Sequence, residues 1–286
     1  MIVVTGATGE LGQIIVKQLA SRVAPEQIGV SVRDPAKADD LAALGVRVRR
    51  GDFSDAASLP HAFEGATQVL LVSSNAAAHG GDPLAQHAAA IDAARAVGAT
   101  RIVYTSQIAA SPDSAFAPAR DHAATEKMLA DSGLAWTALR NGFYASSALG
   151  MMSWAFESGV MATPQDGKIV WTSHDDLGEA AAIILAGGGQ YDGPTPALTG
   201  SQALDFSDLA ALASEVLGRP VRHETYPDDQ LAANMGGLPA GAAKFLLGMY
   251  VASRAGEFAP ADPTLEQLLG RPPITMREVM ARKLAV

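Results

Sequence analysis

The fold is decided near the start of the chain by the stretch Thr5-Gly6-Ala7-Thr8-Gly9-Glu10-Leu11-Gly12. This stretch follows the apolar run Ile2–Thr5 and opens a segment whose apolar residues recur at helical spacing. In such a loop the first glycine permits a tight turn and the second lets backbone amides approach a diphosphate. The third lets the helix pack against the strand. Because unpaired amides and the helix dipole favour an anion at a helix N-terminus, the stretch predicts a dinucleotide-binding loop.

Short runs rich in β-branched residues alternate with helical segments through the first half of the chain. Strands that alternate with helices form βαβ units, whose right-handed crossovers wind a parallel sheet covered on both faces. The sequence therefore predicts an α/β fold with a doubly wound parallel sheet of the Rossmann type. The predicted strands are Ile2–Thr5, Ile28–Arg33, Val46–Arg50, Val69–Ser73, Arg101–Ser106 and Trp136–Arg140.

The pattern of the sequence changes near residue 150. A strand is predicted at Lys168–Thr172, helices at Asp176–Ala186 and Phe206–Leu217, and a mostly helical C-terminal part. No proline- or serine-rich linker divides the chain. We therefore expect an NAD(P)-binding domain over residues 1–150, packed against a smaller, mostly helical lobe over residues 151–286. Segments around residues 166–200 are candidates to return to the sheet.

Composition excludes several classes of function. The 286 residues carry a formal net charge of −9, which disfavours a broad nucleic-acid-binding face. The absence of cysteine excludes disulfides, thiolate nucleophiles and cysteine-ligated zinc. No apolar stretch has the length of a membrane span or the pattern of a signal peptide, so we expect a cytoplasmic protein with no membrane partner. His79 and His87 fit no metal-binding spacing, so we expect no metal site.

The end of the second predicted strand indicates which dinucleotide binds. An acidic residue there holds the ribose hydroxyls of NAD, whereas an arginine suits the 2′-phosphate of NADP. Here the strand ends in Arg33, followed one helical turn later by Lys37. A guanidinium pairs bidentately with a phosphate, so NADPH is favoured. The alternative is that Arg33 is a solvated surface residue. The adjacent Asp34 leaves this alternative open, and with it the use of NADH.

Several further motifs carry a resemblance to a known family. They are Val3-Val4-Thr5-Gly6-Ala7-Thr8-Gly9, Val32-Arg33-Asp34-Pro35-Ala36-Lys37-Ala38, Gly51-Asp52-Phe53, Leu71-Val72-Ser73-Ser74, Tyr104-Thr105-Ser106, Glu126-Lys127-Met128-Leu129-Ala130-Asp131-Ser132-Gly133 and Leu139-Arg140-Asn141-Gly142-Phe143-Tyr144. Over essentially its whole length the chain resembles the NmrA-like group of atypical short-chain dehydrogenase/reductases. Within that group it looks most like the NAD(P)H:quinone oxidoreductase type 2 and triphenylmethane reductase proteins.

The resemblance implies a set of cofactor-binding residues. It places the glycine loop on the pyrophosphate, Arg33 on the adenosine phosphate, and the residues after the third strand beside the adenine. Residues after the fourth strand would lie along the ribose and pyrophosphate, and those after the sixth strand beside the nicotinamide. Glu10 departs from relatives that carry glutamine, and its carboxylate suits a pyrophosphate only if it turns outward. The implied residues are Gly6, Ala7, Thr8, Gly9, Glu10, Leu11, Arg33, Asp52, Phe53, Ser73, Ser74, Asn75, Asn141, Gly142, Phe143 and Tyr144.

The Tyr-xxx-Lys pair of ordinary short-chain dehydrogenases is missing, because no tyrosine has a lysine four residues later. Without that acid, reduction of a simple ketone to an alkoxide is costly. A quinone or a triarylmethyl cation accepts hydride readily and mainly needs to be held against the nicotinamide. The candidates for orienting such an acceptor are Tyr104, His122, Lys127, Asn141 and Tyr144. The alternatives are sheet packing for Tyr104, a helix cap for His122 and a solvated surface charge for Lys127.

Two functions from different classes are consistent with these residues. The first is an NAD(P)H-dependent oxidoreductase that passes hydride to a quinone or a similar conjugated, electrophilic small molecule. The second is a non-catalytic NAD(P)-binding redox sensor of the NmrA type that acts through a protein partner. The sequence favours the enzyme, since the resemblance is strongest to reductases. It leaves open whether the protein is a monomer or a homodimer.

Overall fold

The computed structural model describes residues 1–236 and 241–284, which divide into two compact, interleaved units. Unit 1 comprises Met1–Gln107, Asp121–Arg140 and His174–Pro196, and unit 2 comprises Ile108–Arg120, Asn141–Ser173 and Ala197–Val286. The boundary predicted at residue 150 therefore differs from the observed division. Residues 108–120 and 141–150 belong to unit 2, whereas residues 174–196 return to unit 1 because they add a helix and a strand to it.

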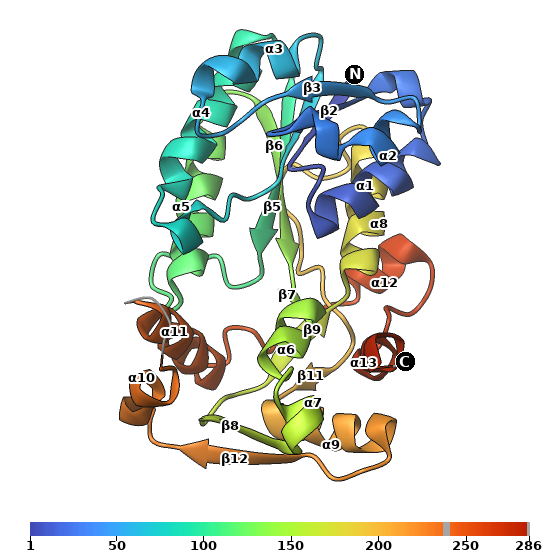
Figure 1. The fold of residues 1–286 in the computed structure, drawn as a ribbon. Helices are drawn as coiled ribbons and strands as arrows, with labels where there is room; N and C mark the ends of the chain where they lie inside the picture. The colour runs from blue at the N-terminus through green and yellow to red at the C-terminus, as the bar shows by residue number, and fades with distance from the viewer. Residues whose placement is uncertain (237–240, 285–286) are drawn as a thin grey trace. The chain divides into compact units, whose positions relative to one another are not determined.

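Unit 1 is a seven-stranded sheet with helices on both faces (Figure 1). Its strands are β1 (Ile2–Thr5), β2 (Ile28–Val32), β3 (Arg47–Arg50), β4 (Gln68–Leu71), β5 (Arg101–Gln107), β6 (Ala135–Asn141, the last residue falling in unit 2) and β10 (Gly193–Pro194). Its helices are α1 (Glu10–Ala20), α2 (Asp39–Ala42), α3 (Leu59–Phe63), α4 (Pro83–Ala96), α5 (Ala117–Asp131, the first turn in unit 2) and α8 (His174–Ala186).

The strand order β10-β6-β5-β4-β1-β2-β3 confirms the predicted doubly wound topology. Strand β1 pairs in parallel with both β2 and β4, so the chain reverses its winding direction between β1 and β4. Ligands of open α/β sheets bind in the crevice outside the carboxyl ends of the strands at such a switch point. The glycine loop follows β1 directly, which places it at this crevice.

Both faces of this sheet are covered for identifiable reasons. On one face α3, α4 and α5 pack over Val69, Ile102 and Tyr104 (Figure 1). On the other face α8 packs along α1, and Gly178 permits the close approach because a Cβ there would collide with Ile14. After β2 the chain forms a 3-10 turn, Pro35–Lys37, which Asp34 caps.

Unit 2 is built around an aromatic core and two small sheets. The sheets have the orders β11-β9-β7 and β12-β8, and the core contains Phe116, Trp171, Phe206 and Phe258. Its elements are β7 (Phe143–Tyr144), α6 (Ala145–Met151), α7 (Ala155–Ser158), β8 (Val160–Pro164), β9 (Ile169–Thr172), β11 (Ala203–Leu204), α9 (Phe206–Leu217), β12 (Arg222–Tyr226), α10 (Leu231–Asn234), α11 (Ala242–Arg254), α12 (Thr264–Leu269) and α13 (Met276–Leu284). Across residues 1–236 and 241–284, no helix is both long and apolar enough to cross a membrane.

Candidate dinucleotide-binding site

The glycine loop has the geometry that its spacing predicts. Gly6 adopts a φ of +59°, the left-handed region that favours glycine. A Cβ at Gly6 would lie 3.3 Å from the Cβ of Val72, so the loop runs close against the chain that leaves β4. A Cβ at Gly12 would collide with the carbonyl oxygen of Gly6. Glycine at position 12 is therefore required for α1 to begin this close to the loop.

The N-terminus of α1 carries no side-chain cap, because its N-cap residue is Gly9. The Glu10 carboxylate lies 3.2 Å from Nδ1 of His174 at the start of α8. Burial lowers the pKa of His174, and the nearby Glu10 opposes that shift. The Glu10 side chain, which is 64% exposed, thus has a partner on α8.

Arg33 lies exposed just after β2 and makes no hydrogen bond or ion pair within the part of the chain that is described. Its neighbour Asp34 is engaged locally, since Asp34 Oδ1 accepts the N–H of Ala36 at 3.2 Å. Lys37 is exposed on the same short turn. The end of β2 therefore offers two cations, while its one adjacent carboxylate caps a turn.

Side chains from three different elements hold the backbone that leaves β4. Three successive N–H groups of this segment donate to side-chain acceptors, where a strand would have donated to a neighbouring strand. The pairs are Val72 with Thr5 Oγ1 at 2.9 Å, Ser73 with Thr105 Oγ1 at 2.8 Å, and Ser74 with His87 Nε2 at 2.9 Å. The segment that the resemblance assigns to the ribose and pyrophosphate is thus fixed by β1, β5 and α4.

His87 belongs to this cluster but is not among the predicted site residues, because its partners lie on other elements and no local pattern marks them. Its Nε2 accepts the N–H of Ser74, so the hydrogen resides on Nδ1, which lies 2.8 Å from Thr125 Oγ1. Burial lowers the pKa of His87 to about 4. Neutral His87 therefore links α5 to the segment after β4.

Gln86 joins two of the segments implied to bind the adenosine half of the cofactor. Its Oε1 lies 2.5 Å from Ser74 Oγ, and its Nε2 donates to Ser54 Oγ at 3.2 Å. Ser54 in turn donates its N–H to Asp52 Oδ1 at 2.9 Å, which closes the turn after β3. Phe53 packs against the core of unit 1, and Asn75 precedes a 3-10 turn without capping it.

Helix α5 stands where ordinary short-chain dehydrogenases carry the Tyr-xxx-Lys pair. Here its His122 is paired with another residue of the protein. His122 Nδ1 lies 2.7 Å from the hydroxyl of the fully buried Tyr104, and burial lowers the pKa of His122 to about 3. His122 is thus neutral at pH 7. Lys127 instead faces solvent, with 77% of its side chain exposed, and pairs with Asp131 at 2.7 Å. The structure therefore brings Tyr104 and His122 together and keeps Lys127 away from them.

Asn141, Gly142, Phe143 and Tyr144 belong to unit 2. The Asn141 side chain is buried, and its Oδ1 has no hydrogen-bond partner among the described residues. Burial raises the pKa of Tyr144, and a hydrogen bond from Asn141 opposes that shift. The Phe143 ring packs against aromatic rings of the unit 2 core and meets Trp171 and Phe258 edge to face. Within unit 2 the structure thus joins Asn141 to Tyr144 and leaves one buried acceptor unpaired.

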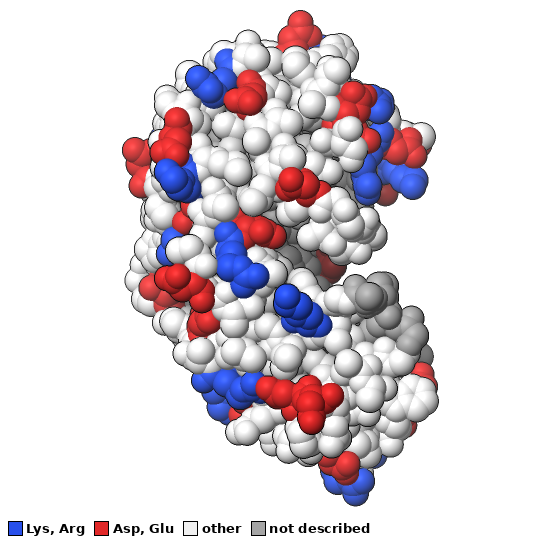
Figure 2. Space-filling view, turned by 90° about the vertical axis from the view of Figure 1, so that its left-hand side faces the viewer, with Lys and Arg blue, Asp and Glu red and all other residues white. Residues whose placement is uncertain are grey.

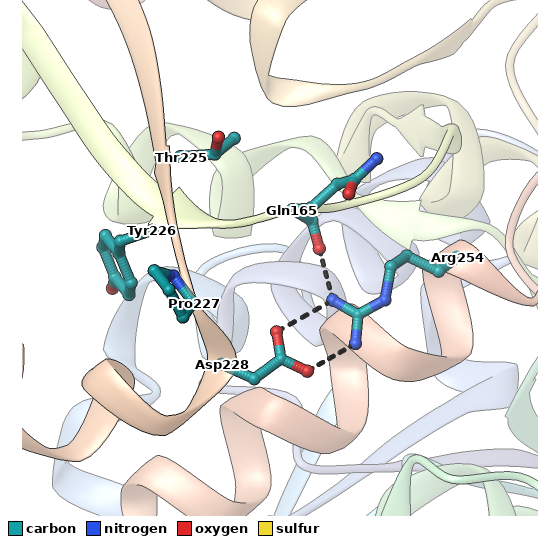
Figure 3. A pocket seen from close by; sticks show the side chains of 6 residues that line it. All are labelled: Gln165, Thr225, Tyr226, Pro227, Asp228 and Arg254. Atoms are coloured by element: carbon teal, nitrogen blue, oxygen red, sulfur yellow. Dashed lines mark hydrogen bonds and ion pairs between the residues drawn. The ribbon is translucent and has the colours of Figure 1, made fainter.

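Three other features give no further candidate for this site. Within the described residues, no group of three or more His, Cys, Asp or Glu could hold a metal ion. A cavity of about 490 Å³ lies in unit 2, where Arg254 pairs with both carboxylate oxygens of Asp228 (Figure 3). None of the site residues predicted from the sequence lines this cavity.

On the face drawn in Figure 2, basic and acidic side chains are interspersed, so this face carries no extended basic field.

Comparison with known proteins agrees with the family resemblance. The model of the NmrA-like family matches residues 1–273. Quinone oxidoreductase 2 of Escherichia coli is 38% identical over 281 residues, which are 97% of this chain and 96% of that protein. The crystal structure of an NADPH-dependent quinone oxidoreductase from E. coli complexed with NADPH matches with a TM-score of 0.92 at 37% identity, covering 99% of both chains. Triphenylmethane reductase of Citrobacter sp., complexed with NADP(H), matches with a TM-score of 0.88 at 30% identity, again over 99% of both chains. The chain therefore belongs to the NmrA-like family.

Proposed function

We propose that this protein is an NADPH-dependent oxidoreductase that transfers hydride to a quinone or a similar conjugated acceptor. The observation that carries the proposal is the arrangement at the end of β2, where Arg33 is exposed and unpaired among the described residues while Asp34 caps a turn. Relatives that cover nearly the whole chain are named for NADPH-dependent quinone reduction and for triphenylmethane reduction. The glycine loop and the strand order support binding of a dinucleotide, and the names of the relatives support this class of reaction.

The residues of unit 1 fit the cofactor in three places. The amides of the glycine loop and of the uncapped start of α1 would bind the diphosphate, and Arg33 with Lys37 would bind the 2′-phosphate. The segment after β4 would lie along the ribose, held by Thr5, Thr105 and His87. When bound, NADPH supplies a hydride, and a quinone that takes up this hydride and one proton becomes a hydroquinone.

The acceptor class follows from what α5 offers. In ordinary relatives this helix supplies the acid, but here Tyr104 and His122 face each other and Glu126 binds Ser106 and Arg140. A quinone needs little acid catalysis because its reduced oxygen is stabilised by conjugation, so close and oriented binding supplies most of the rate. Asn141 and Tyr144 remain our candidates for contacts at the reacting end. Cytoplasmic action, the absence of a nucleic-acid partner and a monomeric or homodimeric state stay predictions.

The test mixes purified protein with NADPH and a series of benzoquinones, and follows the absorbance of reduced nicotinamide. We expect oxidation well above the uncatalysed rate, with NADPH preferred over NADH. If the protein binds NADPH but no acceptor accelerates its oxidation, the proposal is wrong and the redox-sensor hypothesis replaces it. Failure to bind either coenzyme in calorimetry would contradict both hypotheses.

A further inference from the structure

Strand β5 ends in a buried acceptor that no described residue satisfies. Gln107 is the last residue of β5, and its Oε1 is buried without a hydrogen-bond partner among the described residues. Buried polar atoms are almost always paired, and an unpaired one marks a place where a ligand or a water supplies the missing group. Gln107 was not among the residues predicted from the sequence.

The backbone immediately before Gln107 is firmly held. Ser106 is buried and donates its hydroxyl to Glu126 Oε1 at 2.6 Å. Glu126 also accepts from Arg140 Nε at 3.2 Å and from Arg140 Nη2 at 2.7 Å. This ion pair joins the ends of β5 and β6 to α5 within unit 1. The Ser106 hydroxyl and two nitrogens of Arg140 are thereby bonded to Glu126, and the Gln107 oxygen is left unpaired.

The strand order of unit 1 places Gln107 relative to a bound dinucleotide. Arg33 at the end of β2 marks the adenosine phosphate, and the glycine loop after β1 marks the diphosphate. In the order β2-β1-β4-β5 the chain of the dinucleotide therefore continues across β4 toward β5. Its nicotinamide end thus lies on the side where β5 ends in Gln107.

The chemistry of the reactants selects the partner of this oxygen. An oxidised quinone presents only acceptor oxygens, so it has no N–H or O–H for Gln107 Oε1 to accept. The carboxamide of nicotinamide has two N–H donors. We propose that Gln107 Oε1 accepts a hydrogen bond from this carboxamide and so fixes which way the ring is turned. The inference rests on the proposed function, since it requires NADPH to bind.

The experiment compares two coenzymes by calorimetry on the ligand-free protein, with no acceptor present. The probes are NADPH and its 3-acetylpyridine analogue, in which a methyl ketone replaces the carboxamide and removes the N–H donors. We expect the wild-type protein to bind NADPH about tenfold more tightly than the analogue. The substitution Gln107→Met should weaken NADPH about tenfold and leave the analogue nearly unchanged, so that the preference disappears.

Two further variants complete the design. Gln107→Glu keeps an acceptor oxygen and should restore the preference for NADPH. Gln267→Leu changes an exposed glutamine of α12 and should alter neither affinity. Equal losses for both coenzymes in Gln107→Met would overturn the inference, and so would equal affinities in the wild-type protein, a result that needs no variant to fold. Wild-type protein that binds neither coenzyme would overturn the proposed function itself.

Discussion

At the scale of single residues, we expect coenzyme preference to depend on the different roles of the neighbours Arg33 and Asp34. Asp34 has the charge to hold ribose hydroxyls, but its Oδ1 accepts the N–H of Ala36. Arg33 is left exposed and unpaired among the described residues, with Lys37 on the same turn. By contrast, two arginines of the neighbouring strand β3 have carboxylate partners, since Arg49 pairs with Glu64 and Arg50 with Asp55.

Replacing Arg33 tests this division. We expect Arg33→Ala to raise the Kd for NADPH roughly 10- to 100-fold, because charge-assisted hydrogen bonds contribute about 1.5–3 kcal/mol. The Kd for NADH should change little, since NADH has no 2′-phosphate. Titration of nicotinamide fluorescence measures both constants. Arg95→Ala, an exposed arginine on α4, serves as the control and should change neither Kd. Equal losses for the two coenzymes would contradict the phosphate assignment.

Gly12 permits a second test at this scale. Gly12→Ala places a methyl group against the carbonyl oxygen of Gly6, which is backbone and can yield only if the loop shifts. We expect a loss of about 1–3 kcal/mol in the free energy of unfolding and weaker NADPH binding. Thermal unfolding and calorimetry measure the two effects. Gly150→Ala on α6, where a Cβ meets nothing within 4 Å, should be neutral or slightly stabilising. If the two substitutions behave alike, close packing does not explain Gly12.

At the scale of elements, the chain leaving β4 is not held by its own secondary structure. Its three N–H groups donate to Thr5 on β1, Thr105 on β5 and His87 on α4. Only neutral His87 can accept the N–H of Ser74, because protonated imidazole has no acceptor nitrogen. The position of this segment is therefore tied to the protonation state of one buried histidine.

This link predicts a pH dependence. Burial lowers the pKa of folded His87 from 6.5 to about 4, so the unfolded chain binds more protons between these values. The contribution of neutral His87 to the free energy of unfolding is fully present above pH 6.5. It is lost as the pH drops toward 4, by on the order of 3 kcal/mol. Thermal unfolding at a series of pH values measures the loss. His87→Gln, which keeps an acceptor but does not titrate, should show a shallower fall. An identical pH profile in the variant would rule out this role for His87.

At the scale of the whole molecule, both units are assembled from discontinuous segments. Helix α8 lies far along the sequence from α1 but packs against it, with Arg22 paired to Glu179 at 2.9 Å. Gln68 of β4 donates to the carbonyl of Leu185 at 3.1 Å, which further joins α8 to the sheet. Unit 1 is thus completed by residues 174–196.

A truncated chain tests this assembly. A fragment of residues 1–150 contains every residue implied to bind the cofactor but lacks α8 and β10. Because the apolar face of α1 then lies exposed, we expect no cooperative unfolding transition and no NADPH binding. Circular dichroism during heating and calorimetry measure both properties. The full chain is the control, and a fragment that folds and binds NADPH would contradict the observed division into units.

The sequence by itself determined the parallel sheet, the glycine loop and the arginine at the end of β2. These features follow from local rules, because strand runs, helical spacing and a glycine at a positive φ are encoded by neighbouring residues. Only the tertiary structure decided the role of His87, the orientation of Lys127 and the ion pair of Glu126 with Arg140. Their partners lie on other elements, and the free energy of a buried polar group depends on whether folding brings such a partner within hydrogen-bond distance.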